Sequence, residues 1–290
     1  MHAGLATTVE ARGLDEDEAP LLAAFRAAGH TADRVEWEDA SVDWASFDVV
    51  LLRSTWNYTV DLAAFLGWAR KVASVTRLYN PIPMLDWSTD KRYLLDLEHA
   101  GVPIVPSAIT APGEPWVAPA SDEFVIKPSV GAGSRGARRF LAAEAASARQ
   151  HAERLNAEGY HALTQPYLHS VDDYGETALM IFEGEFSHAI RKGALLTRGG
   201  SEVPGLFAKE TIEPRVPGAD ELDVAYRAVA AIPGGAPLYA RVDLIKDPSG
   251  QPCVLELEIA EPSLFFNYAQ GSADRFVRHV LARLGKSAAT

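Results

Sequence analysis

The sequence predicts an α/β fold in its N-terminal part and a β-hairpin close to its C-terminus. Strand-like and helix-like segments alternate over about the first 80 residues, which is typical of a small open α/β domain. Residues 48–53 form a continuous apolar run of the kind found in buried parallel strands. Two apolar runs at 238–245 and 253–259 flank an Asp-Pro-Ser-Gly turn, which predicts a hairpin.

Length and composition fit an ordinary globular protein. The chain of 290 residues is long enough for several substructures within one body, and 48% hydrophobic with 23% charged residues is a usual balance. The net charge of -12 argues against nucleic acid as the main partner, so an anionic ligand needs a local cluster of Lys and Arg. None of these features predicts the oligomeric state.

Cysteine usage and hydropathy exclude several kinds of site and location. Cys253 is the only cysteine, which excludes an intrachain disulfide and a cysteine metal cage, and we interpret it as a core residue. No apolar run approaches the roughly 20 residues that span a bilayer. The N-terminus lacks the basic and apolar segments of a signal peptide. We therefore expect no membrane partner and a cytoplasmic location.

The N-terminal domain is expected to place polar groups at one edge of its sheet. We expect strands at 3–9, 35–37, 48–53 and 76–79, and helices at 20–29 and 59–73. Ligands of such sheets bind beyond the carboxyl ends of the strands. Arg53 stands at one of these ends, so it is a candidate clamp for a carboxylate or a phosphate. The alternative is a surface loop with structural aromatic residues.

Two lysines in the middle of the chain are candidates for binding an anion. A helix is expected at 89–100, and Lys91 in its first turn is electrostatically unfavourable unless an anion neutralises it. A strand at 123–128 delivers Lys127 into the small-residue loop 129–139, whose backbone amides can approach a phosphate closely. The loop alone is equally typical of a structural turn, and the neighbouring Lys127 favours the phosphate interpretation.

The elements that follow continue the mixture of strands and helices. We expect a helix at 142–158, strands at 161–168, 177–182 and 185–192, a loop at 197–213, and helices at 219–232 and 272–284. Pro166 cannot sit inside a sheet, so it marks a sheet edge or a crossover between domains. His188 is either a structural residue or a base, and the apolar flanks of its strand favour the structural interpretation.

The hairpin brings several charged side chains to one face. Because side chains alternate along a strand, Arg241 and Asp243 share one face, and Glu256 and Glu258 share one face. Antiparallel pairing can bring Asp243 opposite the two glutamates. Three carboxylates on one face repel one another unless a cation lies among them, and hard oxygen ligands suit Mg²⁺ in combination with phosphates. The alternative is an edge hairpin with a solvated polar face.

Taken in order, these motifs resemble the ATP-grasp superfamily over nearly the whole chain. The resemblance is carried by Lys91, Val125-Ile-Lys-Pro128, Gln165-Pro-Tyr-Leu168, Arg241-Val-Asp243 and Glu256-Leu-Glu258. It implies the ATP-grasp fold, which combines α/β and α+β regions. It divides the chain into an N-terminal α/β domain at 1–85, a central lobe at 86–164 and a C-terminal lobe at 165–290, with ATP clamped between the two lobes.

The resemblance also implies what these residues bind. The residues implied to hold the nucleotide are Lys91, Lys127, Ser129, Gly131, Gly133, Gln165, Tyr167, Leu168 and Asp172. Asp243, Glu256 and Glu258 would bind one or two Mg²⁺ ions. Many members of the superfamily have Asn where Glu258 stands here, and a carboxylate remains a hard oxygen ligand. Arg241 would stabilise an acyl phosphate or its tetrahedral adduct.

A narrower resemblance is carried by three phrases. They are Leu52-Arg-Ser-Thr-Trp-Asn-Tyr58, Phe186-Ser-His-Ala-Ile-Arg-Lys192 and Glu256-Leu-Glu-Ile-Ala-Glu-Pro-Ser263. They are similar to the cyclo-ligases that form D-cycloserine from O-ureido-D-serine. This implies an ATP- and Mg²⁺-dependent ligase that activates the carboxylate of an amino-acid-like substrate as an acyl phosphate. An amine-type nucleophile of the same molecule would then attack it. The alternatives are an intermolecular ligase of amino acids or peptides, and a small-molecule kinase.

Substrate contacts are expected near the reacting end of the site. The candidates are Arg53, Tyr58 and Glu261, and Arg191 joins Arg241 as a catalytic candidate. Glu261 either holds an amino group or supports the residues that contact the substrate. Specificity is expected in the loops near Arg53, 15–17 and 197–213. A catalytically silent nucleotide-binding module is disfavoured, because both lysines and all three metal carboxylates are present.

Overall fold

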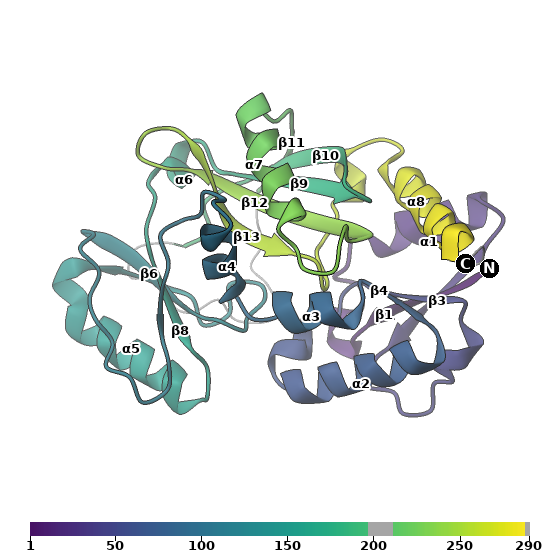
Figure 1. The fold of residues 1–290 in the computed structure, drawn as a ribbon, viewed down its shortest axis with the longest axis horizontal. Helices are drawn as coiled ribbons and strands as arrows, with labels where there is room; N and C mark the ends of the chain where they lie inside the picture. Colours follow the sequence, from purple (N-terminus) through teal and green to yellow (C-terminus); the bar gives the residue numbers. More distant parts are fainter. Residues whose placement is uncertain (197–210, 288–290) are drawn as a thin grey trace.

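The computed structural model describes residues 1–196 and 211–287 and arranges them around an N-terminal, a central and a C-terminal sheet (Figure 1). Of the loop predicted at 197–213, residues 197–210 lie outside the described residues. No helix within the described residues is long and apolar enough to cross a membrane.

The N-terminal sheet is parallel, with strand order β2-β1-β3-β4. Its strands are β1 (His2–Thr7), β2 (Thr31–Glu36), β3 (Val49–Leu52) and β4 (Arg77–Tyr79). The main helices of this region are α1 (Glu18–Ala27) and α2 (Leu62–Val75). All of β3 is buried, as expected for the apolar run at 48–53. The predicted open α/β domain is confirmed.

The central sheet is antiparallel, with strand order β5-β8-β6-β7. Its strands are β5 (Ala108–Thr110), β6 (Glu123–Pro128), β7 (Arg138–Leu141) and β8 (Ala162–Pro166). Helix α5 (Ala145–Ala157) packs Ala148 and Leu155 against Phe124 and Phe140 of the sheet. Strand β8 lies between two other strands and ends at Pro166. The proline therefore marks the crossover into the next region and not a sheet edge.

The C-terminal sheet is antiparallel, with strand order β11-β10-β9-β12-β13. Its strands are β9 (Glu176–Phe182), β10 (Glu185–Lys192), β11 (Ile212–Arg215), β12 (Tyr239–Lys246) and β13 (Pro252–Glu258). The pair β12–β13 is the predicted hairpin. The last two residues of the loop predicted at 197–213 belong to β11. The sequence alone did not indicate this strand.

Each face of the C-terminal sheet has its own cover (Figure 1). On one face, helices α4 (Tyr93–His99) and α7 (Ala219–Ala230) pack against buried side chains that include Leu179, Val242 and Leu244. We call this the α7 face. On the other, the α8 face, helix α8 (Ser272–Ser287) and α1 cover Met180, Phe182 and Tyr239. The rest of the α8 face, with Arg241 and Lys192, lines the cavities described below.

The helix predicted at 89–100 begins later than expected. Residues 82–88 form a separate helix, α3 (Ile82–Ser88), and α4 begins at Tyr93, so Lys91 lies in the turn between them. The sequence concealed α3 because two prolines stand at its start. Proline is tolerated in the first turn of a helix, and Pro83 occupies such a position.

Short elements connect the larger ones. These are α6 (Ser170–Asp173) and the 3₁₀ turns η1 (Val9–Ala11), η2 (Trp44–Ser46), η3 (Trp56–Thr59), η4 (Ala142–Glu144) and η5 (Phe266–Tyr268). The proposed domain boundaries at 85/86 and 164/165 fall close to the transitions between sheets, although β8 extends to Pro166. Helix α4, placed in the central lobe by those boundaries, packs in the core of the C-terminal sheet.

Candidate active site

Two cavities lie between the sheets and meet at one place. The first, of about 310 Å³, is lined by the N-terminal region, the α8 face and the segment 259–268. The second, of about 150 Å³, is lined by the central sheet and the C-terminal sheet. The described residues that line both are Lys91, Gly131, Gly133, Lys192, Glu256 and Glu258. Ligands in the two cavities would therefore share these contacts.

The register of the hairpin places four charged side chains on one face. Arg241 pairs with Glu258, and Asp243 pairs with Glu256, across β12 and β13. Directly opposed residues of an antiparallel pair point to the same side of a sheet. The sequence predicted this common face from the alternation of side chains along each strand, and the register of the two strands confirms it.

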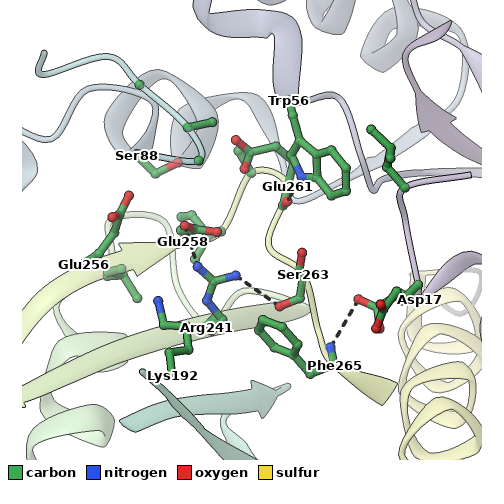
Figure 2. A pocket seen from close by; sticks show the side chains of 18 of the residues that line it. Asp17, Trp56, Ser88, Lys192, Arg241, Glu256, Glu258, Glu261, Ser263 and Phe265 are labelled. Carbon is green, nitrogen blue, oxygen red and sulfur yellow. Dashed lines mark hydrogen bonds and ion pairs between the residues drawn. The ribbon is translucent and has the colours of Figure 1, made fainter. Parts of the chain in front are cut away.

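Cations of the protein hold these carboxylates (Figure 2). Arg241 Nε donates to Asp243 Oδ1 at 2.9 Å, and its Nη2 donates to Glu258 Oε1 at 2.6 Å. Lys192 Nζ lies 2.7 Å from Asp243 Oδ2 and 2.7 Å from Glu176 Oε2. Burial opposes ionisation of Asp243, but Arg241 and Lys192 outweigh it and lower its pKa to about 2.

Glu258 has a different electrostatic environment from Asp243. Burial raises the pKa of Glu258 to about 8, against the attraction of Arg241 and reinforced by repulsion from Glu256 and Glu261. Its side chain is still 24% exposed, towards the shared part of the cavities. A cation arriving there would meet a carboxyl group that the protein only partly neutralises.

The two predicted lysines differ in the cavities that they line, since Lys91 lines both and Lys127 lines the second. Lys91 Nζ pairs with Glu256 Oε1 at 3.0 Å and donates to the carbonyl of Gly131 at 2.5 Å. Lys127 lines the second cavity from the end of β6. Burial lowers the pKa of Lys127, and within the described residues it forms no ion pair. Lys127 is thus a positive group with free capacity for an anion.

The small-residue loop forms part of the wall between the cavities. Gly131 and Gly133 line both cavities, and Gly133 has a φ of 60°, a conformation that favours glycine. A Cβ atom on Gly131 would approach Pro128 to 3.2 Å. Ser129, also predicted to contact the nucleotide, is buried and lines neither cavity, while its carbonyl accepts from the Lys91 amide at 2.7 Å.

The second cavity has an apolar slot beside residues 165–168, some of which the resemblance implies to hold the nucleotide. Gln165 and Leu168 line it, and the slot is closed by Val105, Val125, Ile245 and Leu255. Tyr167 also lines it, but its amide donates to the carbonyl of Glu123 at 2.9 Å. The Tyr167 N–H is therefore already used, and the Leu168 carbonyl accepts from the Val171 amide at 3.1 Å, which leaves the Tyr167 carbonyl and the Leu168 N–H for a ligand.

Asp172 lies beside this slot and not in its wall. Its carboxylate accepts from the hydroxyl of Tyr167 at 2.6 Å, and its side chain is 44% exposed. The guanidinium of Arg139 covers the ring of Tyr167 at 3.3 Å from the centroid. Asp172 can reach a nucleotide only beyond the edge of the slot, so its part in holding the nucleotide stays a prediction.

The predicted substrate residues separate into two groups. Tyr58 and Glu261 are buried side chains that line the first cavity. Arg53 does not line it, because its guanidinium points to a small hollow at the ends of β1 and β3. There Arg53 Nη2 donates to the carbonyl of Pro262 at 2.9 Å and lies 3.5 Å from Asp17. Arg53 therefore fixes the segment that carries Glu261, and the geometry does not support its role as a substrate clamp.

Lys192 lines the cavities, and the predicted catalytic candidate Arg191 does not. Strand alternation turns Arg191 to the α7 face, where it donates to the carbonyls of Tyr174 and Asp173, both at 2.9 Å. Lys192 turns to the α8 face and lines both cavities. The catalytic candidate at this strand end is Lys192, and Arg191 does not reach the site. The signal was present as a two-residue basic pair, but choosing between them requires the strand register.

Asp17 is a site residue that the sequence placed within the loop 15–17, where specificity is expected, without a role of its own. It is 3% exposed, lines the first cavity and accepts from the amides of Leu264, Phe265 and Phe266. Phe265 has a φ of 51°, and its ring lies 5.6 Å from the Arg241 guanidinium. The N-terminal region thus fixes the shape of the loop beside Arg241.

The donor set can be tested against Mg²⁺. Within the described residues, no three His, Cys, Asp or Glu side chains are arranged as a finished metal cage. Mg²⁺ commonly uses only one or two carboxylates and completes its octahedron with phosphate and water. Glu256 and Glu258 fit that requirement, since their side chains are 23% and 24% exposed in the shared region. Direct binding by Asp243 requires Arg241 or Lys192 to release it.

Comparison with known proteins gives consistent matches along the whole chain. Residues 3–80 match the family model described as D-cycloserine synthetase DcsG, N-terminal domain. The cycloserine biosynthesis protein DcsG of Streptomyces lavendulae is 40% identical over 300 residues, which cover 97% of this chain and 98% of that protein.

Solved structures agree with these matches. The crystal structure of D-cycloserine synthetase DcsG has a TM-score of 0.91 and 39% identity, covering 98% of this chain and 100% of that one. The D-alanine–D-alanine ligase of Bacillus anthracis, complexed with ATP, has a TM-score of 0.71 and 14% identity, covering 99% and 98% of the two chains. The second similarity concerns the fold alone.

Proposed function

The chain belongs to the DcsG family of ATP-grasp ligases, and we propose that it closes O-ureido-D-serine into D-cycloserine with ATP and Mg²⁺. It is an ATP-dependent ligase with a small-molecule substrate. Because the reaction consumes ATP, we place it in the cytoplasm.

One observation carries the proposed assignment of sites: two cavities of different character share a floor of cations and carboxylates. The second cavity has an apolar slot next to Lys127, which suits a base followed by phosphates. The first is larger and has charged groups at its inner end, which suits a small polar substrate. Phosphoryl transfer needs the two ligands in contact, and the shared residues mark that contact point.

The shared floor neutralises charge on the transferred group. Lys91, Lys127 and Lys192 would bind phosphate oxygens, and the glycine-rich loop would donate backbone N–H groups. Glu256 and Glu258 would hold Mg²⁺, with Asp243 as a further ligand once its cations turn to phosphate. Bound there, Mg²⁺ would supply positive charge that offsets the negative charge of the phosphates. We propose one or two ions.

Arg241 is the residue best placed to act on the acyl group. Its guanidinium lies at the inner end of the first cavity, held by Asp243, Glu258 and the carbonyl of Ser263 at 3.2 Å. A positive group fixed in this way requires little reorganisation when an oxyanion forms beside it. Arg241 would stabilise the acyl phosphate and the tetrahedral adduct that follows it.

Ring closure then balances as follows. The substrate carboxylate takes the γ-phosphoryl group and becomes an acyl phosphate. The nitrogen bonded to oxygen in the same molecule attacks the acyl carbon, a C–N bond forms, and phosphate leaves with one carboxylate oxygen. The attacking nitrogen gives up its proton and still carries the carbamoyl group of the ureido substituent. Hydrolysis of the bond to that carbamoyl group consumes one water, releases carbon dioxide and ammonia, and leaves the free ring.

The proposal is tested by incubating the protein with ATP, Mg²⁺ and O-ureido-D-serine. We expect release of ADP and phosphate that depends strictly on this substrate, a product with the mass of D-cycloserine, and loss of turnover with a chelator. A product that gains the mass of a phosphate would identify a kinase. A product containing two joined amino acids would identify an intermolecular ligase. Either result, or no turnover, would overturn the proposal.

A further inference from the structure

Glu261 is a buried carboxylate whose charge no neighbouring cation contacts. It is 5% exposed and lines the first cavity, and Figure 2 shows it beside the ring of Trp56. Within the described residues its side chain forms no ion pair, and the hydrogen bond that stabilises its charge comes from its own backbone amide. Proteins rarely bury a carboxylate without a cationic partner, because burial removes its hydration.

The cations nearest to this part of the cavity are already engaged. Lys91 pairs with Glu256 at 3.0 Å, and Arg241 pairs with Asp243 and Glu258. They attract the Glu261 carboxylate only from a distance, and burial outweighs that attraction and raises its pKa. In the described part of the chain no cationic side chain forms an ion pair with Glu261, so a cationic ligand would supply the missing partner.

The backbone around Glu261 is held firmly from the N-terminal region. Trp56 Nε1 donates to the Glu261 carbonyl at 3.2 Å, and Arg53 donates to the next carbonyl, that of Pro262, at 2.9 Å. Asp17 accepts from the backbone amides of Leu264 and Phe266, which follow Glu261 on the chain. A side chain positioned in this way needs little ordering when a ligand binds.

We propose that Glu261 is the ammonium subsite of the first cavity and restricts its substrates to amino acids with a free α-amino group. This inference rests on the proposed function and specifies its substrate class. Glu261 follows Glu258 closely on the chain, and Glu258 pairs with Arg241, which in the proposed function stabilises the reacting acyl group. The subsite thus lies near the carboxylate end of the substrate, where the α-amino group is attached. Trp56 and Tyr58 add aromatic surface to the same wall.

The subsite has a consequence for the selectivity of the reaction. An ammonium group held by a carboxylate has no lone pair with which to attack an acyl phosphate. The ring-forming nitrogen carries no such charge and stays free to react. Glu261 therefore directs attack to one of the two kinds of nitrogen in the substrate.

The test compares two ligands that differ only in the amino group. O-ureido-D-serine and 3-(ureidooxy)propanoate are titrated calorimetrically into protein saturated with Mg-ADP. We expect the wild type to bind the amino compound about 100-fold more tightly, as for a buried charge-assisted contact. Glu261→Gln should reduce that preference to a few-fold, and Glu261→Asp, which keeps the charge, should retain part of it.

The matched control is Glu98→Gln, the same change at an exposed carboxylate of α4 that lines neither cavity, which should keep the wild-type preference. Binding of Mg-ADP reports that each variant is folded. An unchanged preference in Glu261→Gln, equal binding of both compounds by the wild type, or no binding of the amino compound would overturn the subsite. Selective binding without ring formation would instead overturn the proposed function alone.

Discussion

The two faces of the C-terminal sheet use the same strands for different purposes. On the α7 face, Leu179, Val242 and Leu244 are buried in a continuous apolar core. On the α8 face, next to the cavities, Arg241 and Asp243 alternate with those apolar residues. Neighbouring residues of β12 therefore belong to different places, one to the apolar core and the next to the site. The comparison teaches that stability and chemistry should separate between neighbouring residues.

The largest effect should follow from Glu256→Gln on the α8 face. The change keeps the size of the side chain but removes the charge that pairs with Lys91 and is proposed to bind Mg²⁺. We expect kcat to fall about 1000-fold, the scale of losing one group that stabilises the transition state. Thermal unfolding should change little. Near-normal turnover in this variant would remove Glu256 from the metal site.

Glu221→Gln is the matched control on the α7 face. Glu221 is 2% exposed and accepts from Thr177 Oγ1 at 2.6 Å and from the Tyr174 hydroxyl at 3.1 Å. This variant should lose about 1–3 kcal/mol of stability, because a buried hydrogen-bond network is disturbed. Its kcat should remain close to that of the wild type.

Leu244→Ala should affect stability alone. Leu244 is 1% exposed in the core beneath α7 and lines neither cavity. Removing its side chain should cost about 3 kcal/mol in the free energy of unfolding, and chemical denaturation measures this directly. The KM for ATP, measured well below the unfolding temperature, should not change. A large change in KM would mean that the two faces are not independent.

Lys192→Met and Arg191→Met compare two adjacent cations on opposite faces. Lys192 holds Asp243 and lines both cavities, so its loss should lower kcat/KM for ATP about 100-fold. Arg191 binds backbone carbonyls on the α7 face, so its loss should cost about 1 kcal/mol of stability with little effect on turnover. Steady-state kinetics and thermal unfolding of both variants check this. The reverse order would return Arg191 to the catalytic group.

The last effect concerns the pH dependence of stability and His188, a residue of β10 on the α8 face. Burial lowers the pKa of His188 from 6.5 to about 4, and one ring nitrogen lies 2.8 Å from the Leu264 carbonyl. The unfolded chain therefore binds the proton first as the pH falls below 6.5. The stabilisation is complete above that pH and is lost on the way down to about 4.

His188→Gln should remove this dependence. Between pH 7 and pH 5 the wild type should lose about 2 kcal/mol more stability than the variant, by proton linkage. Urea unfolding of both proteins at the two pH values measures the difference. Parallel losses in the two proteins would show that His188 titrates normally in the folded state.

The local features of the fold were predictable because local residues determine them. The hairpin follows from a turn of Asp, Pro, Ser and Gly between alternating strands, and its charged face follows from the period of two. Helix α3 was missed because prolines at its start are equally typical of an extended segment. Strand β5 was missed because three residues carry too little pattern.

The missed parts of the site depend on contacts between distant segments. Whether Arg191 or Lys192 faces the cavities depends on how β10 pairs with β9, which sequence alternation alone does not determine. Arg53 stands where a ligand clamp is expected, yet its partner is a carbonyl more than two hundred positions later in the chain. Asp17 was predicted only as part of the loop 15–17, and its partners are likewise amides of the far C-terminal segment.

The ion pairs between cations and carboxylates in the site affect how the nucleotide binds. Lys91, Lys192 and Arg241 are already neutralised by Glu256, Asp243 and Glu258. Binding of phosphates is therefore an exchange of counterions, in which each lysine released from a carboxylate leaves that carboxylate in need of a metal. Anion and divalent ion then favour each other's arrival. On this basis the protein should take up the nucleotide as its magnesium complex, and free ATP should be a poor competitor.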